Sequence, residues 1–157
     1  MKLNIMIKPV IIGGIITGVL VFIFSFAHIE IGCCCCFLYT LGGIITAYLL
    51  TQEYLPSDRD YLISGALSGG VAGFVSWLLY VLKEIVSILY TTVSILYIIV
   101  LKNYHIAGLY IESTIMNFII MAFLLLIGFF VYLLLGAVFG GIGAILYRII
   151  AAGSYKE

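Results

Sequence analysis

The sequence contains very few charged residues. Only 9% of its 157 residues are Asp, Glu, Lys or Arg, whereas 65% are hydrophobic. A soluble domain is usually nearer one quarter charged, so this chain has too little polar surface to cover itself in water. The composition predicts an integral membrane protein whose main partner is the lipid bilayer. Seven basic residues balance seven acidic ones, which leaves no basic surface for nucleic acid.

The sequence also lacks charges inside the predicted spans, where pumps and proton-coupled transporters need them. No Asp, Glu, Lys, Arg or His lies at the centre of a predicted span. Such residues mark ion paths and proton relays, so their absence argues against a pump, a proton-coupled transporter or an intramembrane protease. There is no phosphate-binding glycine loop with its lysine and no Ser-His-Asp set. These absences favour a protein that is not an enzyme, and we expect no cofactor.

Long uncharged stretches predict an all-α, polytopic membrane domain covering residues 1–157. The predicted transmembrane helices span about residues 9–27, 33–52, 61–82 and 115–147. The first stretch is long enough to cross a bilayer, so we expect a retained helix rather than a cleaved signal peptide. Pro9 suits the start of that helix, where its missing N–H costs nothing.

A fifth apolar run, 85–101, is ambiguous. Polar residues recur on one helical face, at Glu84, Ser87, Thr91 and Ser94. We interpret the run as an apolar amphipathic extension of the third helix or as a separate interfacial helix. The third and fourth helices then exceed the thickness of a bilayer. They either project beyond the outer surface as a paired hairpin, or bend and lie along it.

The distribution of basic residues predicts the orientation of the spans. With four spans and a cytoplasmic N-terminus, five basic residues lie inside and two, Lys83 and Lys102, lie outside. A fifth span over 85–101 gives four inside and three outside, which is a weaker bias. The sequence therefore predicts a multi-pass protein of the cell membrane with both termini in the cytoplasm.

Small residues recur every fourth position in three of the predicted helices. They are Gly14, Gly18, Gly65, Gly69, Gly73, Gly136, Gly140 and Ala144. Such residues let helix backbones approach closely, and close packing drives helix association in lipid. We expect a bundle that is tight in its inner half and more aromatic in its outer half.

Parts of the chain resemble each other. The segment Val10–Phe22 aligns without gaps with Leu62–Phe74, matching Gly13 with Gly65 and Phe22 with Phe74. The pattern indicates a two-helix repeat, 9–52 and 61–147, although membrane helices rich in Gly and Ile align easily. If the repeat is real, its two copies share one orientation.

All four cysteines are consecutive, from Cys33 to Cys36, near the predicted outer face. Cys33 and Cys36 have the C-x-x-C spacing that puts both thiols on one face of a first helical turn, where a thiolate is stabilised. Three functions compete with simple packing of small apolar residues: a redox pair, S-acylation, and a metal site built from His28, Cys33, Cys36 and His105. Packing remains the favoured interpretation.

Two resemblances to known proteins follow from these motifs. Pro9 followed by Gly13-Gly14, with cysteines ahead of Gly42-Gly43, resembles small uncharacterised prokaryotic four-helix membrane proteins over about residues 9–50. The arrangement of four spans with Cys33 and Cys36 resembles that of the quinone-linked disulfide oxidases of bacterial membranes. Those enzymes carry a second cysteine pair in the later outer loop, which 102–112 lacks.

These observations predict an integral membrane protein with a structural or assembly role. It either self-associates through the small-residue helix faces or acts as a subunit of a larger membrane complex. The first alternative is a thiol-disulfide oxidoreductase that uses Cys33 and Cys36 at the outer face. The second alternative is a small channel or transporter, for which Thr17, Thr46, Ser68 and Ser76 are the obvious polar lining.

Overall fold

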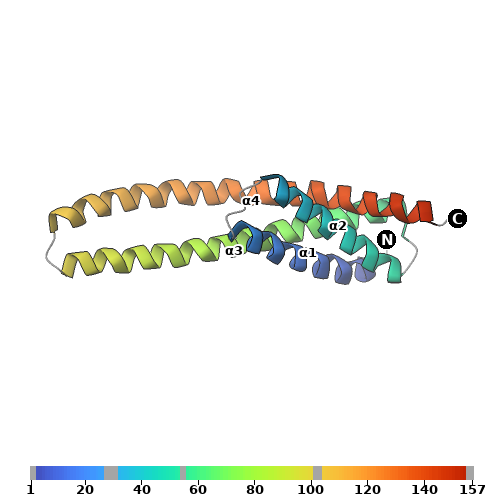
Figure 1. Ribbon diagram of the computed structural model, residues 1–157, viewed down its shortest axis with the longest axis horizontal. Coiled ribbons are helices and arrows are strands. Elements are labelled where there is room, and N and C mark those ends of the chain that lie inside the picture. Colours follow the sequence, from blue (N-terminus) through green and yellow to red (C-terminus); the bar gives the residue numbers. More distant parts are fainter. Residues whose placement is uncertain (1–2, 27–31, 54–55, 101–103, 155–157) are drawn as a thin grey trace.

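The computed structural model describes residues 3–26, 32–53, 56–100 and 104–154, and these residues form four helices (Figure 1). Side-chain surroundings are described for 6–25, 36–52, 56–97 and 116–151. The helices are α1 (Leu3–Phe26), α2 (Gly32–Glu53), α3 (Asp58–Val100) and α4 (Tyr104–Ser154). The predicted all-α fold with long third and fourth helices is confirmed.

Three of the helices are long and apolar enough to cross a membrane, within Met6–Ser25, Asp58–Tyr97 and Met116–Ala151. The apolar part of α2, Cys36–Gln52, is shorter. Its 22 residues nevertheless reach about 33 Å at a rise of about 1.5 Å per residue. That length matches a hydrocarbon core of about 30 Å.

The sequence predicts Pro9 at the start of the first helix, but in the structure it lies inside α1. The helix begins at Leu3 and continues through Pro9. Proline removes one backbone hydrogen bond, but membrane helices tolerate this loss because neighbouring groups satisfy the freed carbonyl. The Pro9 side chain is buried in the bundle.

A hydrogen-bonded turn sets the start of α3. The Ser57 backbone N–H and hydroxyl both donate to Asp60 Oδ2, at 3.0 and 2.9 Å, and the Asp60 N–H donates to the Ser57 carbonyl at 2.9 Å. The bond from the Ser57 N–H to the Asp60 side chain, at the third helical position, is one half of a capping box. From there α3 runs without a break to Val100, so 85–100 continue the third helix.

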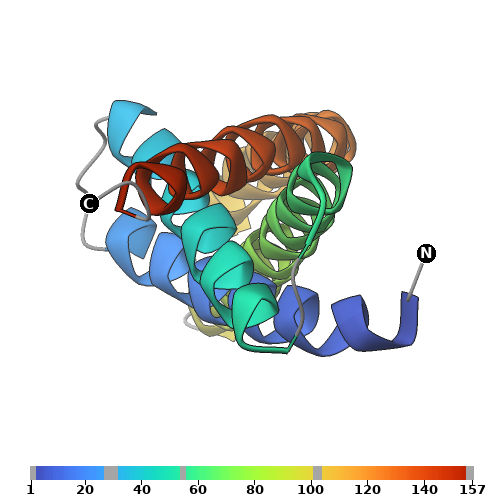
Figure 2. The ribbon, with the colours of Figure 1, turned by 90° about the vertical axis from the view of Figure 1, so that its right-hand side faces the viewer.

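The four helices form a bundle at one end of the molecule. Looking along the long axis, Figure 2 shows α1 and α4 on opposite sides, with α2 and α3 between them. α1 lies beside α3, and Gly14 and Gly18 face Val71 and Val75, so these two helices run in the same direction. α2 lies beside α4. The two predicted repeat units therefore contact each other through corresponding helices, α1 against α3 and α2 against α4.

The second half of α3 and the first half of α4 extend far beyond α1 and α2 as an antiparallel hairpin (Figure 1). α3 has 43 residues and α4 has 51, or about 65 and 76 Å of helix. α1, with 24 residues, reaches only about 36 Å. α3 and α4 thus run without a break through both the four-helix bundle and the hairpin.

Candidate functional site

The predicted small residues of α3 and α4 face one another across the bundle. A Cβ atom built on Gly69 would overlap the Gly136 carbonyl oxygen and lie 2.6 Å from its carbon. One on Gly65 would lie 2.5 Å from the Ala144 Cβ, and Gly73 meets the Tyr132 carbonyl group. The backbones of α3 and α4 are therefore in direct contact along this stripe, as small residues permit in membrane helices.

The small residues of α1 also contact α3. A Cβ on Gly14 would lie 2.6 Å from Val71 Cγ1, and one on Gly18 would lie 2.7 Å from Val75 Cβ. Thus every small residue singled out from the sequence packs against a neighbouring helix of the same chain. These faces are occupied within the molecule and are not open to another one.

Polar side chains of the bundle interior gather where α1, α2 and α3 meet. Thr46 donates a hydrogen bond of 2.7 Å to Ser68, and both side chains are fully buried. Ser76 lies two turns farther along α3 and donates to the carbonyls of Gly18 and Ala72, at 3.1 and 2.8 Å. These three hydroxyls therefore bond to one another or to helix backbone, as most buried polar groups do. The Thr17 hydroxyl is also buried, and it meets no hydrogen-bond partner in the described part of the chain.

The cysteine cluster lies in the first turn of α2, which begins at Gly32. Cys36 is half-buried, and its carbonyl accepts a hydrogen bond of 2.9 Å from the Thr40 hydroxyl. The side chains of Cys33, Cys34 and Cys35, and those of His28 and His105, fall outside the described residues. Within the part that is described, no group of three or more His, Cys, Asp or Glu residues could hold a metal ion.

Aromatic and charged residues form a band at the end of the bundle where α3 begins and α4 ends. Tyr48 and Tyr61 both contact Tyr147, with ring centroids 6.3 and 6.4 Å apart. Arg148 forms an ion pair of 2.8 Å with Asp58, joining the end of α4 to the start of α3. Tyrosines with adjacent charges are typical of a membrane–water interface.

A second aromatic band lies where the hairpin leaves the bundle. The Trp77 indole N–H donates to the Leu125 carbonyl at 2.9 Å, and its ring centroid lies 5.0 Å from that of Phe129. Tyr80 and Tyr132 line the same cavity beside this contact. From Tyr61 to Tyr80 is about 29 Å along α3, close to the thickness of a bilayer core. The two bands are thus spaced as the two interfaces of one membrane.

Glu84 is the charged side chain that the sequence reasoning missed. A span ending at 82 placed it outside the membrane helix, but α3 continues through it, and only 8% of the residue is exposed. Tyr80, one turn earlier in α3, lies close to this carboxylate, and Lys83 Nζ lies 3.8 Å from it. The i,i+4 spacing of Tyr80 and Glu84 on an uninterrupted apolar helix is the signal that could have found this pair.

The hairpin beyond this band is apolar on its exposed surface. The most exposed large side chains include Val86, Tyr90, Val93, Tyr97, Phe123 and Leu126, each at least 60% exposed. The hydroxyls of Thr91, Thr92 and Ser94 donate to carbonyls one turn earlier in α3, at 2.8–3.0 Å. Even the polar residues of this face therefore direct their hydrogen bonds into their own helix.

Four apolar helices, interfacial aromatic bands at both ends of the bundle and glycine-mediated packing define an integral membrane protein of the helical, multi-pass class. The chain belongs to the MJ1491 transmembrane domain family, whose family model matches residues 7–152. No curated protein and no solved structure matches the chain.

Proposed function

We propose that this protein is an assembly subunit of the membrane that self-associates through its α3–α4 hairpin. The observation that carries this proposal is the exposed apolar surface of the hairpin beyond the outer aromatic band. The small-residue faces expected to mediate association are occupied inside the chain. Self-association therefore falls to the hairpin.

The lengths of the helices support this assignment. With the bilayer between the two aromatic bands, about 30 Å of α3 extends past Tyr80 and about 32 Å of α4 extends past Leu125. This distance is as large as the hydrocarbon core itself, so one bilayer cannot cover both the bundle and the hairpin. An apolar surface of this size in water marks a protein–protein interface.

A second copy of the chain suits this surface, because its hairpin presents the same exposed apolar side chains. Tyr90 is 77% exposed and Phe123 is 64% exposed, and aromatic side chains of this kind dominate interface energetics. The exposed hydroxyls of Thr91 and Thr92 already donate within α3, so covering them leaves no donor unsatisfied. Closed symmetric assemblies of identical chains are the commonest way to bury such a face.

Disulfide cross-linking tests this proposal. In a background with Cys33–Cys36 changed to Ser, we expect Tyr90→Cys and Phe123→Cys to form covalent oligomers in native membranes on mild oxidation. Ile12→Cys is the control, because Ile12 is 50% exposed on the lipid-facing side of α1. It should remain monomeric.

Polar substitution supplies a second, independent measurement. The triple change Tyr90→Gln, Val93→Thr and Tyr97→Gln should reduce the particle mass, measured by light scattering in mild detergent, to that of one chain. If the original protein is already monomeric, self-association is refuted, and the role becomes that of a subunit paired with a different chain. An oligomer that survives the triple change would place the interface elsewhere.

Thiol-disulfide exchange is the second candidate function. α2 begins at Gly32, so Cys33 and Cys36 lie three positions apart in its first turn, where a helix N-terminus favours a thiolate. Intact mass after alkylation, with and without prior reduction, distinguishes the two functions. The assembly role predicts four alkyl groups without reduction. Two groups that rise to four on reduction would favour the redox function.

The orientation belongs to the same proposal. We place both termini in the cytoplasm and the hairpin on the outer side, because five of the seven basic residues then lie inside. In the background with Cys33–Cys36 changed to Ser, a membrane-impermeant thiol reagent should label Lys102→Cys, between α3 and α4, in intact cells. A cysteine added after Glu157 should react only after the cells are opened.

A further inference from the structure

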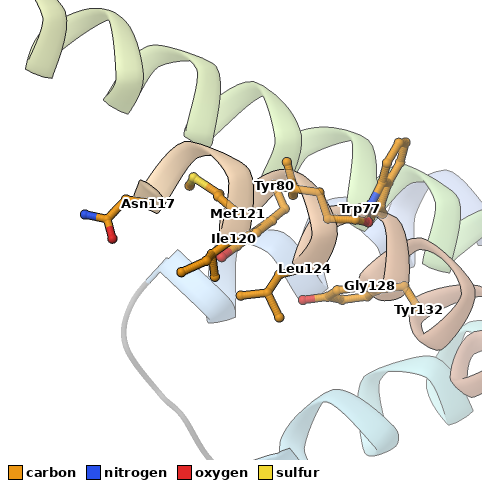
Figure 3. Close-up of a pocket in the computed structure, with 9 residues that line it drawn as sticks. Trp77, Tyr80, Asn117, Ile120, Met121, Leu124, Gly128 and Tyr132 are labelled. Carbon is orange, nitrogen blue, oxygen red and sulfur yellow. Dashed lines mark hydrogen bonds between the residues drawn. The ribbon is translucent and has the colours of Figure 1, made fainter. Parts of the chain in front are cut away.

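A cavity lies between α3 and α4 at the level of the outer aromatic band (Figure 3). Its volume is about 440 Å³. Trp77, Tyr80 and Tyr132 contribute aromatic and polar surface, whereas Ile120, Met121, Leu124 and Leu125 form an apolar wall. Figure 3 shows Asn117 at the end of the cavity opposite Trp77 and Tyr132. A cavity of this size, apolar with a few polar groups, is typical of a small-molecule site.

The charged side chains close to Tyr80 are Glu84 and Lys83, which pair with each other and do not line the cavity. No Lys or Arg is among the lining residues. Lys83 lines a different groove, with Phe22 and Leu82, and its side chain is 44% exposed. A bound anion would therefore find no cation in the cavity wall. A bound cation would meet the aromatic rings of Trp77, Tyr80 and Tyr132.

One ammonium group of the chain itself lies beside the Tyr80 ring, outside the cavity. Lys83 Nζ lies 5.4 Å from the centroid of the Tyr80 ring and 3.8 Å from Glu84 Oε1. Ammonium groups bind over aromatic rings by cation–π attraction, most strongly where water is excluded. Trp77 and Tyr132 add two further rings inside the cavity.

We infer that this cavity binds an amphiphile with an ammonium head group, which lies among Trp77, Tyr80 and Tyr132 near Glu84 while its alkyl chain follows the wall of α4. The second groove between α3 and α4 makes the contrast clear. It is lined by apolar residues alone, among them Leu67, Phe74 and Leu134. It offers a chain no head-group partner. This inference does not depend on self-association through the hairpin.

Trp77 makes the inference directly measurable, because it is the only tryptophan of the chain. The full-length protein in lipid nanodiscs is titrated with dodecyltrimethylammonium that carries bromine on its terminal carbon, a heavy atom that quenches indole fluorescence. Chain-matched dodecyl sulfate and dodecanol, brominated in the same way, are the comparison ligands. We expect saturable quenching by the ammonium compound at a concentration at least about fivefold lower than for the other two.

Two glycines provide a matched pair of variants. A Cβ atom on Gly128 or on Gly70 meets nothing within 4 Å, so both positions accept a larger side chain. Gly128 lines the proposed site, whereas Gly70 lines the apolar groove. Gly128→Leu should abolish the saturable quenching, and Gly70→Leu should leave it unchanged. Since alkyl chains partition equally into both nanodisc samples, the difference between the variants isolates the cavity.

Glu84→Gln tests the head-group assignment. It keeps the size of the side chain and removes the charge, so the preference for the ammonium compound over dodecanol should fall at least about threefold. Equal binding of all three compounds to the original protein would overturn the inference, as would quenching that Gly128→Leu does not reduce. If Glu84→Gln lowers expression, the Gly128 and Gly70 pair still decides the result.

Discussion

A single methyl group at Gly69 should separate two helices that now touch, whereas the same group at the next residue should not. In α3, a Cβ on Gly69 would lie 2.6 Å from the Gly136 carbonyl carbon and would overlap its oxygen. A Cβ on Gly70 meets nothing within 4 Å. Gly69→Ala and Gly70→Ala therefore form a matched pair on one helix.

The magnitudes follow from this geometry. Ordinary contact begins near 3.4 Å. The carbonyl carbon alone therefore requires α3 and α4 to move apart by at least about 0.8 Å at Gly69, in a core that is normally close-packed, and the nearer oxygen requires more. Overpacking of this kind costs about 1–3 kcal/mol. Replacing glycine with alanine in a helix gains up to about 1 kcal/mol. Gly69→Ala should thus lower the free energy of unfolding by up to about 3 kcal/mol, while Gly70→Ala should leave it unchanged or raise it by up to about 1 kcal/mol.

The assay is titration with sodium dodecyl sulfate in mild detergent micelles, followed by Trp77 fluorescence. Trp77 reports the contact because its indole donates to the Leu125 carbonyl of α4. The Gly69→Ala transition should occur at lower denaturant than that of the original chain, and the Gly70→Ala transition should not. Equal shifts in one direction for the two variants would refute the close-packing argument, because helix propensity alone would then explain both.

Two further predictions concern polar groups of the bundle. Thr46→Val should lower the free energy of unfolding by about 1–3 kcal/mol, because it removes the 2.7 Å hydrogen bond to Ser68 and leaves the buried Ser68 hydroxyl unpaired. Thr17→Val should be neutral or stabilising in the same titration, because the buried Thr17 hydroxyl meets no hydrogen-bond partner in the described part of the chain. Arg148→Ala should cost less than about 1 kcal/mol, because its ion pair with Asp58 is exposed; a larger loss that persists in high salt would show that the pair is shielded from solvent.

Much of the fold could be predicted from the sequence because lipid imposes strong local constraints. A span must be helical and about 20 residues long, so uncharged runs reveal the helices. The prediction that Pro9 starts the first helix was wrong, because in a membrane bundle neighbouring groups can satisfy the carbonyl that proline leaves free. The MJ1491 transmembrane domain match agrees with the predicted class of small membrane protein.

The candidate site was less predictable. Glu84 seemed to end a span because a charge followed an apolar run of ordinary length. In the structure it is buried, with Tyr80 and Lys83 beside it. Whether a carboxylate on a helix meets lipid, water or a neighbouring helix depends on its partners. The cavity could not be predicted either, because its two walls are far apart in the chain.

By itself, the sequence determined that this protein lies in a membrane, that it is helical, and that α1, α3 and α4 carry small residues every fourth position. These properties follow from composition and local spacing. Only the tertiary structure decided which glycines meet, that the small-residue faces are occupied within the chain, and that the hairpin remains uncovered. The physical reason is that burial and contact are relations between helices. A periodic pattern states that a face can pack closely, and its partner is decided when the helices assemble.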